Sequence, residues 1–208
     1  LVIGDSSGKS TLLRNMIHRI SEGIPPSDAK LLVIDYRRQL LGECPATHLA
    51  GYASTKQDVQ EFISQLVPLL ESRMPAGVDD PQTLRDRSWW KGPDIFLVVD
   101  DYDLVATSSG NPLQGLLELL PYGRDIGLHM VVARRCTGFS RTSFEPIMAR
   151  LRELHPTIFL MSGTAEEGII AGGRKARSLS KGRADVISNQ GTHQVVQFAH
   201  HVGEEKTE

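Results

Sequence analysis

The sequence predicts an α/β fold with a mainly parallel sheet, helices on both faces and a C-terminal hairpin. Short apolar runs alternate with helix-like segments along nearly all of the 208 residues, which favours parallel strands joined by crossover helices. The run 95–99 is apolar at every position, as expected of a strand covered on both faces. The turn-rich segment 189–192 separates two short β-like runs and therefore indicates a hairpin.

The individual elements follow from the spacing of apolar residues. A strand at 1–3 precedes a helix at 10–22, where Leu12, Met16 and Ile20 recur on one helical face. The same criteria predict, in order, a strand at 31–34, a helix at 58–73, the strand at 95–99, a short amphipathic helix at 112–121, a strand at 128–133, a helix at 143–154, a strand at 157–161, and hairpin strands at 184–188 and 194–198.

Composition limits the domain count and the class of protein. We expect one domain over residues 1–202 and a loose polar tail at 203–208. Because residue 1 already lies inside a predicted strand, we also expect the chain to be a fragment of a longer multi-domain protein. Lys and Arg total 23 and Asp and Glu total 25, which argues against a globally basic nucleic-acid-binding protein. No apolar run is long enough for a membrane-spanning helix. Two distant cysteines, Cys44 and Cys136, argue against a disulfide scaffold.

A phosphate-binding loop, or P-loop, is predicted between the first strand and the first helix. Glycines let backbone N–H groups turn toward an anion, and the start of the helix adds partial positive charge. The loop lysine reaches the β- and γ-phosphates, and the next hydroxyl can ligate Mg²⁺. The alternative is a Gly/Ser loop that merely caps a helix. The residues assigned to ATP are Gly4, Asp5, Ser6, Ser7, Gly8, Lys9, Ser10 and Thr11, and Ser10 is also assigned to Mg²⁺.

The loop departs from the standard pattern, which has four residues between its glycines. Here three residues separate Gly4 from Gly8. Either the loop is degenerate or the sequence skips one residue. We favour the skipped residue, because the strand, the lysine, the serine and the helix are all in place.

Two acidic residues follow the most strand-like run of the chain. A carboxylate at the end of such a strand can hold Mg²⁺ through water, and we assign this role to Asp100. Asp101 stands where many ring ATPases carry a glutamate that orients the attacking water. We therefore assign Asp101 as catalytic, with a weaker hold on that water because its side chain is one methylene shorter. The alternative is an ordinary strand end with two solvated carboxylates.

Arginines are the remaining candidates for contact with phosphate. Arg134 and Arg135 follow the strand at 128–133, at the edge of the sheet that should carry the phosphates. Either residue could sense the γ-phosphate, and we assign Arg134 as catalytic, although a surface arginine is an equally common outcome. Arg124 could serve a neighbouring subunit as an arginine finger.

Several segments, taken in order, resemble the FtsK/SpoIIIE-type ATPases. They are Trp-Trp-x-Gly-Pro at 89–93, Val-Val-Asp-Asp-Tyr-Asp at 98–103, Tyr-Gly-Arg-Asp-Ile-Gly-Leu-His at 122–129 and Ala-Arg-Arg at 133–135. Within that group the chain is most similar to the C-terminal ATPase domain of the EccC family of bacterial type VII (ESX) secretion. The resemblance covers nearly the whole chain.

This resemblance implies a RecA-like ATPase domain, one of several in tandem, that binds ATP and Mg²⁺. It implies a motor at the cytoplasmic side of the bacterial inner membrane that assembles as a ring with its other ATPase domains. It also implies export of Esx/WXG100 or PE/PPE proteins, with the substrate's C-terminal tail recognised by this domain. The short loop and Asp101 depart from the fully active pattern, so we expect slow hydrolysis.

Three other functions remain open, two from the residues and one from the resemblance. A small-molecule P-loop kinase would need a lid with arginines, and the basic loop 171–183 is the lid candidate. A DNA translocase is suggested by the FtsK relationship, but a pI near 6.4 argues against DNA as the main ligand. A binding module with an inactive nucleotide site is a third possibility.

Overall fold

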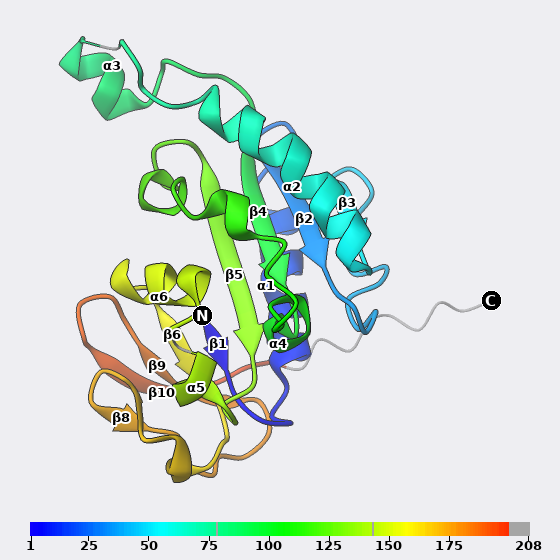
Figure 1. The fold of residues 1–208 in the computed structure, drawn as a ribbon, viewed down its shortest axis with the longest axis vertical. Coiled ribbons are helices and arrows are strands. Elements are labelled where there is room, and N and C mark those ends of the chain that lie inside the picture. The colour runs from blue at the N-terminus through cyan, green and yellow to red at the C-terminus, as the bar shows by residue number, and fades with distance from the viewer. Residues whose placement is uncertain (78, 143, 200–208) are drawn as a thin grey trace.

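The structure, a computed structural model, describes residues 1–77, 79–142 and 144–199, and its centre is an eight-stranded sheet (Figure 1). The strand order is β10-β9-β6-β1-β5-β4-β2-β3. Six strands are parallel, namely β1 (Val2–Ile3), β2 (Ala29–Ile34), β3 (Leu49–Ala53), β4 (Asp94–Val99), β5 (Leu128–Arg134) and β6 (Ile158–Leu160). The sheet ends in the antiparallel hairpin of β9 (Arg183–Ile187) and β10 (His193–Gln197), which confirms the predicted fold class.

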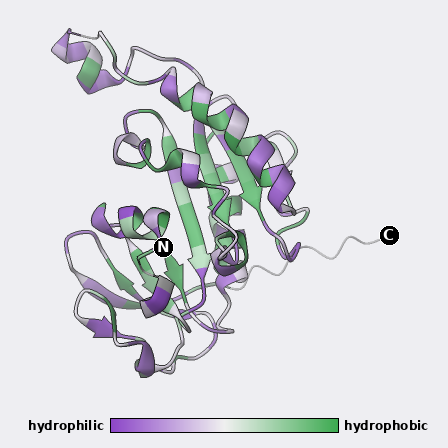
Figure 2. Ribbon diagram, in the orientation of Figure 1, coloured by the Kyte–Doolittle hydropathy of each residue, from purple (hydrophilic) through white to green (hydrophobic). Residues whose placement is uncertain are grey.

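Helices cover both faces of this sheet. Val2, Leu31 and Val33 pack with α1 (Lys9–Gly23) on one face, and Ile3, Leu32 and Ile34 belong to a second core on the other. This second core receives α2 (Lys56–Glu71) and α6 (Pro146–Glu153). Because successive strand residues point to opposite faces, strands that serve two cores are apolar along their length, as Figure 2 shows for the centre of the sheet.

Shorter elements connect these layers. They are α3 (Pro81–Asp86), α4 (Tyr102–Val105), α5 (Phe139–Thr142), a separate hairpin of β7 (Ile169–Ala171) and β8 (Arg174–Lys175), and 3₁₀ turns at Gln114–Leu116, Leu120–Tyr122 and Ala165–Glu167. Within the described residues, no helix is long and apolar enough to cross a membrane. The predicted tail at 203–208 lies outside the described residues.

Two sequence-based expectations about helices were wrong, and two features of the fold were not predicted. The helix expected at 112–121 is a pair of 3₁₀ turns, because Gly115 in its middle and Pro121 near its end disfavour a continuous α-helix. The helix expected at 143–154 starts at Pro146, where Glu145 caps it by accepting from the N–H groups of Ile147 and Met148. The edge strand β3 and the β7–β8 hairpin were not predicted.

The long segment 75–92 is fastened to the fold by its two tryptophans. The indole N–H of Trp89 donates to the carbonyl of Arg73 (2.7 Å), and that of Trp90 donates to the carbonyl of Asp125 (2.9 Å). The buried guanidinium of Arg73 donates to the carbonyls of Ile126 and Pro93 and lies 4.2 Å from the Trp90 ring centre. Both tryptophans therefore hold the chain in place.

We expect Arg73→Ala to lower the free energy of unfolding by about 2–4 kcal/mol, because it leaves the buried carbonyl of Ile126 and the partly buried carbonyl of Pro93 without their donors. Urea unfolding followed by circular dichroism measures this change. Arg19→Ala, on an exposed face of α1, is the matched control and should leave the unfolding midpoint unchanged. Equal midpoints for both variants would contradict the role of Arg73.

Candidate functional site: a phosphate-binding loop at the edge of the sheet

The loop after β1 is fixed by its neighbours before the helix begins. Gly4 donates its N–H to the carbonyl of Arg134 (3.1 Å), and Asp5 donates to the carbonyl of Ser162 (2.8 Å). The carboxylate of Asp5 in turn accepts from the N–H of Cys136. A side chain at Gly4 would place its Cβ 2.6 Å from the Cβ of Met161. The start of the loop is therefore held tightly between β5 and β6.

The rest of the loop presents polar groups that lack protein partners. Ser6 and Gly8 have positive φ values of 46° and 98°, which curl the backbone ahead of α1. Within the described residues, the N–H groups of residues 6–11 have no recorded acceptor, and the buried hydroxyl of Ser7 has no partner. A buried polar group without a partner is costly. An anion that accepts hydrogen bonds from these groups fits the loop, even though only three residues separate its two glycines.

The residues assigned to the metal lie in direct contact. The Ser10 hydroxyl donates to the Asp100 carboxylate (2.6 Å), although the two residues are far apart in sequence. Burial raises the pKa of Asp100, and the nearby charge of Asp101 adds to this effect, whereas the bond from Ser10 opposes it. A divalent cation beside this buried carboxylate would favour its ionised form. Ser10 and Asp100 therefore fit Mg²⁺, with phosphate and water oxygens as the other ligands.

Lys9 and Asp101 face the same loop from two sides. The Lys9 ammonium donates to the carbonyl of Gly4 (3.0 Å), so it lies across the loop that it is predicted to serve. Asp101 adopts a left-handed conformation, with φ 44°, at the start of α4. Its carboxylate forms an ion pair with Arg37 at 3.1 Å. Sequence reasoning missed Arg37, although its position just after β2 places it at the same edge of the sheet.

The two neighbouring arginines at the end of β5 have different environments. The Arg134 guanidinium is buried, pairs with Asp103 at 2.9 Å and lies 5.0 Å from the centre of the Phe139 ring. Arg135 instead lines the cavity around the phosphate-binding loop. Of the two, Arg135 is the one with access to a bound phosphate in this conformation.

These groups enclose a polar cavity of about 490 Å³. Its described lining is Asp5, Ser6, Ser7, Gly8, Lys9, Ser10, Thr11, Arg14, Arg37, Gln39, Asp101 and Arg135. Within the described residues, no group of three or more His, Cys, Asp or Glu could hold a metal by itself. A metal at Ser10 and Asp100 thus depends on oxygens supplied by the nucleotide and by water.

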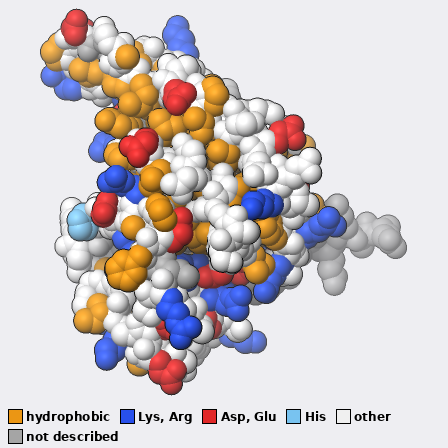
Figure 3. Space-filling model, viewed as in Figure 1, with side chains coloured by type: hydrophobic (Ala, Val, Ile, Leu, Met, Phe, Trp, Pro, Cys, Tyr) orange, Lys and Arg blue, Asp and Glu red, His pale blue; other side chains and the backbone are white. Residues whose placement is uncertain are grey.

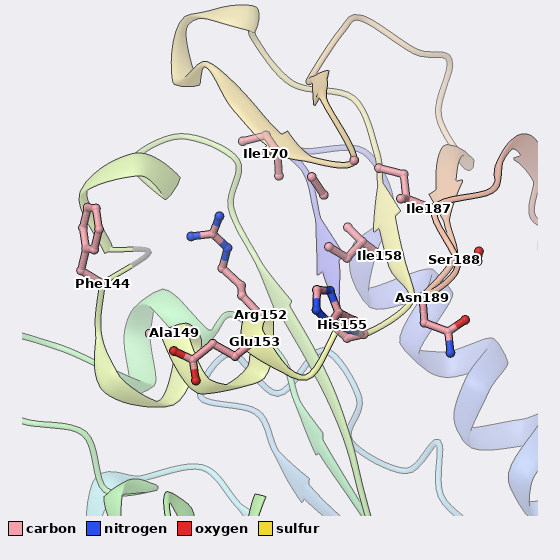
Figure 4. Close-up of a pocket in the computed structure, with 14 residues that line it drawn as sticks. Phe144, Ala149, Arg152, Glu153, His155, Ile158, Ile170, Ile187, Ser188 and Asn189 are labelled. Carbon is pink, nitrogen blue, oxygen red and sulfur yellow. The ribbon is translucent and has the colours of Figure 1, made fainter. Parts of the chain in front are cut away.

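A second cavity, of about 480 Å³, lies at the other end of the neighbouring strand β6 and shares no residue with the first. Figure 4 shows that Ile158, Ile170 and Ile187 come from different strands to form one wall. Arg152 extends its guanidinium between these residues and Phe144, whose side chain is 84% exposed. Sequence reasoning did not locate this cavity, since its residues are brought together by the sheet and not by a motif.

Comparisons with known proteins place the chain among secretion proteins. No protein-family model matches the chain. The ESX-4 secretion system protein EccC4 of Mycobacterium tuberculosis is 46% identical over 200 residues, which is 96% of this chain and 16% of that protein. The ESX secretion system protein EccC of Thermomonospora curvata is 41% identical over 201 residues, 96% of this chain and 15% of that protein. The chain thus spans about one sixth of these relatives.

Solved structures show the same fold. The cytoplasmic domain of the Thermomonospora curvata type VII secretion ATPase EccC matches with a TM-score of 0.92 and 41% identity, covering 96% of this chain and 23% of that one. A structure of its ATPases 2 and 3 with a signal sequence peptide matches with the same TM-score and identity, covering 96% of this chain and 36% of that one. The chain therefore belongs to the EccC family of ESX secretion ATPases, with their FtsK-like, RecA-type ATPase fold.

Proposed function

We propose that this chain is an ATP-binding, slowly hydrolysing domain of a type VII secretion motor that also recognises the tail of a secreted substrate. The observation that carries the nucleotide half is the loop 4–11, whose N–H groups lack acceptors beside the Ser10–Asp100 pair. The motor would act at the cytoplasmic side of the inner membrane, with other ATPase domains of the same assembly as partners.

The chain's own residues would divide the work as follows. The N–H groups of residues 6–11 and the Lys9 ammonium bind the phosphates, and Ser10 and Asp100 hold Mg²⁺. When bound, Mg²⁺ neutralises charge on the β- and γ-phosphate oxygens. Asp101 would orient the attacking water, and Arg135 would contact the terminal phosphate from the end of β5.

The ion pair of Asp101 with Arg37 supports slow turnover. While this pair is closed, the carboxylate is directed toward Arg37 at 3.1 Å, so it is restrained from orienting water. An arginine finger from a neighbouring subunit is worth 10³ or more in rate in other nucleotide hydrolases, and an isolated domain lacks it. Arg124 is exposed and is the candidate for such a finger. We therefore expect the isolated chain to keep ATP bound and to hydrolyse it slowly.

The second cavity is where we place the substrate tail. Its isoleucine wall and the exposed ring of Phe144 suit the apolar anchors of a short amphipathic helix. It lies at the N-terminal end of β6, whereas the phosphate-binding loop follows the C-terminal end of the adjacent parallel strand β1, so both ligands can bind together. The signal-peptide complex of the related EccC supports this class of ligand. On the face seen in Figure 3, basic and acidic side chains are intermixed, which does not favour DNA.

Lys9→Ala should lower the affinity for ATP with Mg²⁺ by roughly 100-fold or more, because the phosphates lose the ammonium of the loop. Isothermal titration calorimetry measures the change. Lys91→Ala, on the exposed loop before β4, is the matched control. An unchanged affinity in Lys9→Ala would contradict the assignment of the loop.

Two substitutions should speed turnover of the isolated chain, by different routes. Asp101→Glu extends the carboxylate toward the water and should raise kcat by roughly ten-fold. This is part of the roughly 10²- to 10⁴-fold rate enhancement that a well-positioned general base supplies. Arg37→Ala should also raise kcat by freeing Asp101, whereas the adjacent Arg38→Ala should not. Phosphate release at saturating ATP is the assay. A fall in kcat with Arg37→Ala would show that Arg37 serves the phosphate directly and does not restrain Asp101.

Phe144→Ala should weaken binding of C-terminal peptides from small secreted helical proteins by roughly ten-fold, since aromatic anchors dominate such interfaces. Tyr122→Ala, which removes an exposed ring outside the cavity, should have no effect. Fluorescence anisotropy with labelled peptides and with duplex DNA at physiological salt makes the comparison. Tight DNA binding with no response to any tail peptide would favour the translocase alternative.

A further inference from the structure

We propose that Arg177 and Asp185 form a clamp that positions the phosphate-binding loop from outside the phosphate cavity. This inference rests on the proposed nucleotide function and adds the residues that keep the loop in its binding shape. Neither residue belongs to the described lining of the cavity. Arg177 begins the segment 177–182, whose other end is hydrogen-bonded to the loop. Both are therefore positioning residues, which act on the phosphates through this segment.

The clamp is an ion pair anchored in the sheet. Asp185 lies in β9, between β6 and β10, and its side chain is only 3% exposed. Arg177 donates from Nε to one carboxylate oxygen (2.9 Å) and from Nη2 to the other (2.8 Å). The ring nitrogen Nε2 of His193 in β10 lies 3.1 Å from the same carboxylate. Two parallel bonds of this kind fix the orientation of the arginine as well as its distance.

A carboxylate at this place in the sheet needs the arginine. Its neighbours in β9, Ala184 and Ile187, are buried and apolar, and a buried charge without a partner is costly. Hydrogen bonds from Arg177 lower the pKa of Asp185 against the opposing effect of burial, so the carboxylate is ionised at neutral pH. A buried ion pair adds little net stability compared with apolar packing. The main effect of the clamp is therefore on the conformation of the segment that Arg177 begins.

The first half of this segment supports the start of the phosphate-binding loop. The carbonyl of Arg177 accepts from the N–H of Gly163 (3.1 Å), and the N–H of Leu179 donates to the Ser162 hydroxyl (3.1 Å). The carbonyl of Ser162 in turn accepts from the N–H of Asp5 (2.8 Å). The stretch after β6 thus lies between the segment and the loop and is hydrogen-bonded to both.

The far end of the segment contacts the loop directly. The N–H of Gly182 donates to the carbonyl of Ser7 (3.2 Å). A trans peptide is planar, so its C=O and N–H groups point in opposite directions. Holding the Ser7 carbonyl toward Gly182 therefore directs the N–H of Gly8 the other way, and Gly8 lines the phosphate cavity. Without a fixed segment this peptide could rotate, and the loop would lose a preorganised donor to phosphate.

The test measures binding of ATP and of inorganic tripolyphosphate, each with Mg²⁺, by isothermal titration calorimetry. Arg177→Ala should weaken binding of both ligands by the same factor, because both use the loop. The factor should be roughly 2- to 30-fold, the range for residues that act on a site without touching it. Arg174→Ala, the matched control, removes an exposed arginine from the same basic loop and should change neither affinity.

Two further measurements separate positioning from a general loss of stability. Asp185→Asn keeps the shape of the side chain, and combining it with Arg177→Ala should cost no more affinity than the more damaging single change. Both substitutions break one interaction, so their effects should not add. In hydrogen exchange, the amide of Gly182 should exchange faster in Arg177→Ala, whereas the amide of Leu97 in the central strand β4 should not.

Each other outcome contradicts a stated part of the proposal. Unchanged affinity in Arg177→Ala would overturn the clamp and leave the nucleotide function standing. An equal loss in Arg174→Ala would overturn it as well, since the effect would then come from charge alone. Additive losses in the double variant, or faster exchange at Leu97 and Gly182 alike, would also overturn the clamp. Failure of the unchanged chain to bind either ligand would overturn the nucleotide function and, with it, the clamp.

Discussion

The hydrogen bond between Ser10 and Asp100 is the contact on which the nucleotide site depends. It exists because β1 and β4, which flank β5, run parallel and end at the same edge of the sheet. The loop after β1 supplies the hydroxyl and the N–H groups, and the end of β4 supplies the buried carboxylate. Residues 90 positions apart thus meet through sheet topology, and Lys9, Asp101 and Arg135 line the cavity beside them.

The same edge also connects the nucleotide site to the second cavity. Tyr102, two residues after Asp100, donates its hydroxyl to Glu145, and Asn111 donates to the same carboxylate. Glu145 caps α6, whose last turn carries Arg152 at the second cavity. The backbone from Asp100 to Tyr102, the hydrogen bonds at Glu145 and helix α6 therefore link the proposed metal-binding carboxylate to the proposed peptide site. Burial and the bond to Glu145 raise the pKa of Tyr102, so its hydroxyl remains a donor at neutral pH.

Local patterns in the sequence were sufficient for the fold class, the hairpin and the phosphate-binding loop, because each has a short-range signature. They were insufficient for β3, which contains Gly51 and exists because it pairs with β2 while Phe62 occupies the space beside that glycine. They could not distinguish Arg134 from Arg135 either. Alternation along a strand places adjacent side chains on opposite faces, but it does not say which face is open. In three dimensions the ion pair with Asp103 buries the Arg134 side chain, whereas the Arg135 side chain is exposed.

The position of β1 has a consequence for how the domain folds during synthesis. This strand precedes its two partners in the sheet, β5 and β6, by more than 120 residues. A growing chain can form helices early, but the loop at 4–11 stays without its supports until β5 and β6 have left the ribosome, since long-range pairing must await both partners. Nucleotide affinity would therefore arise late in synthesis, and incomplete chains would not hold ATP.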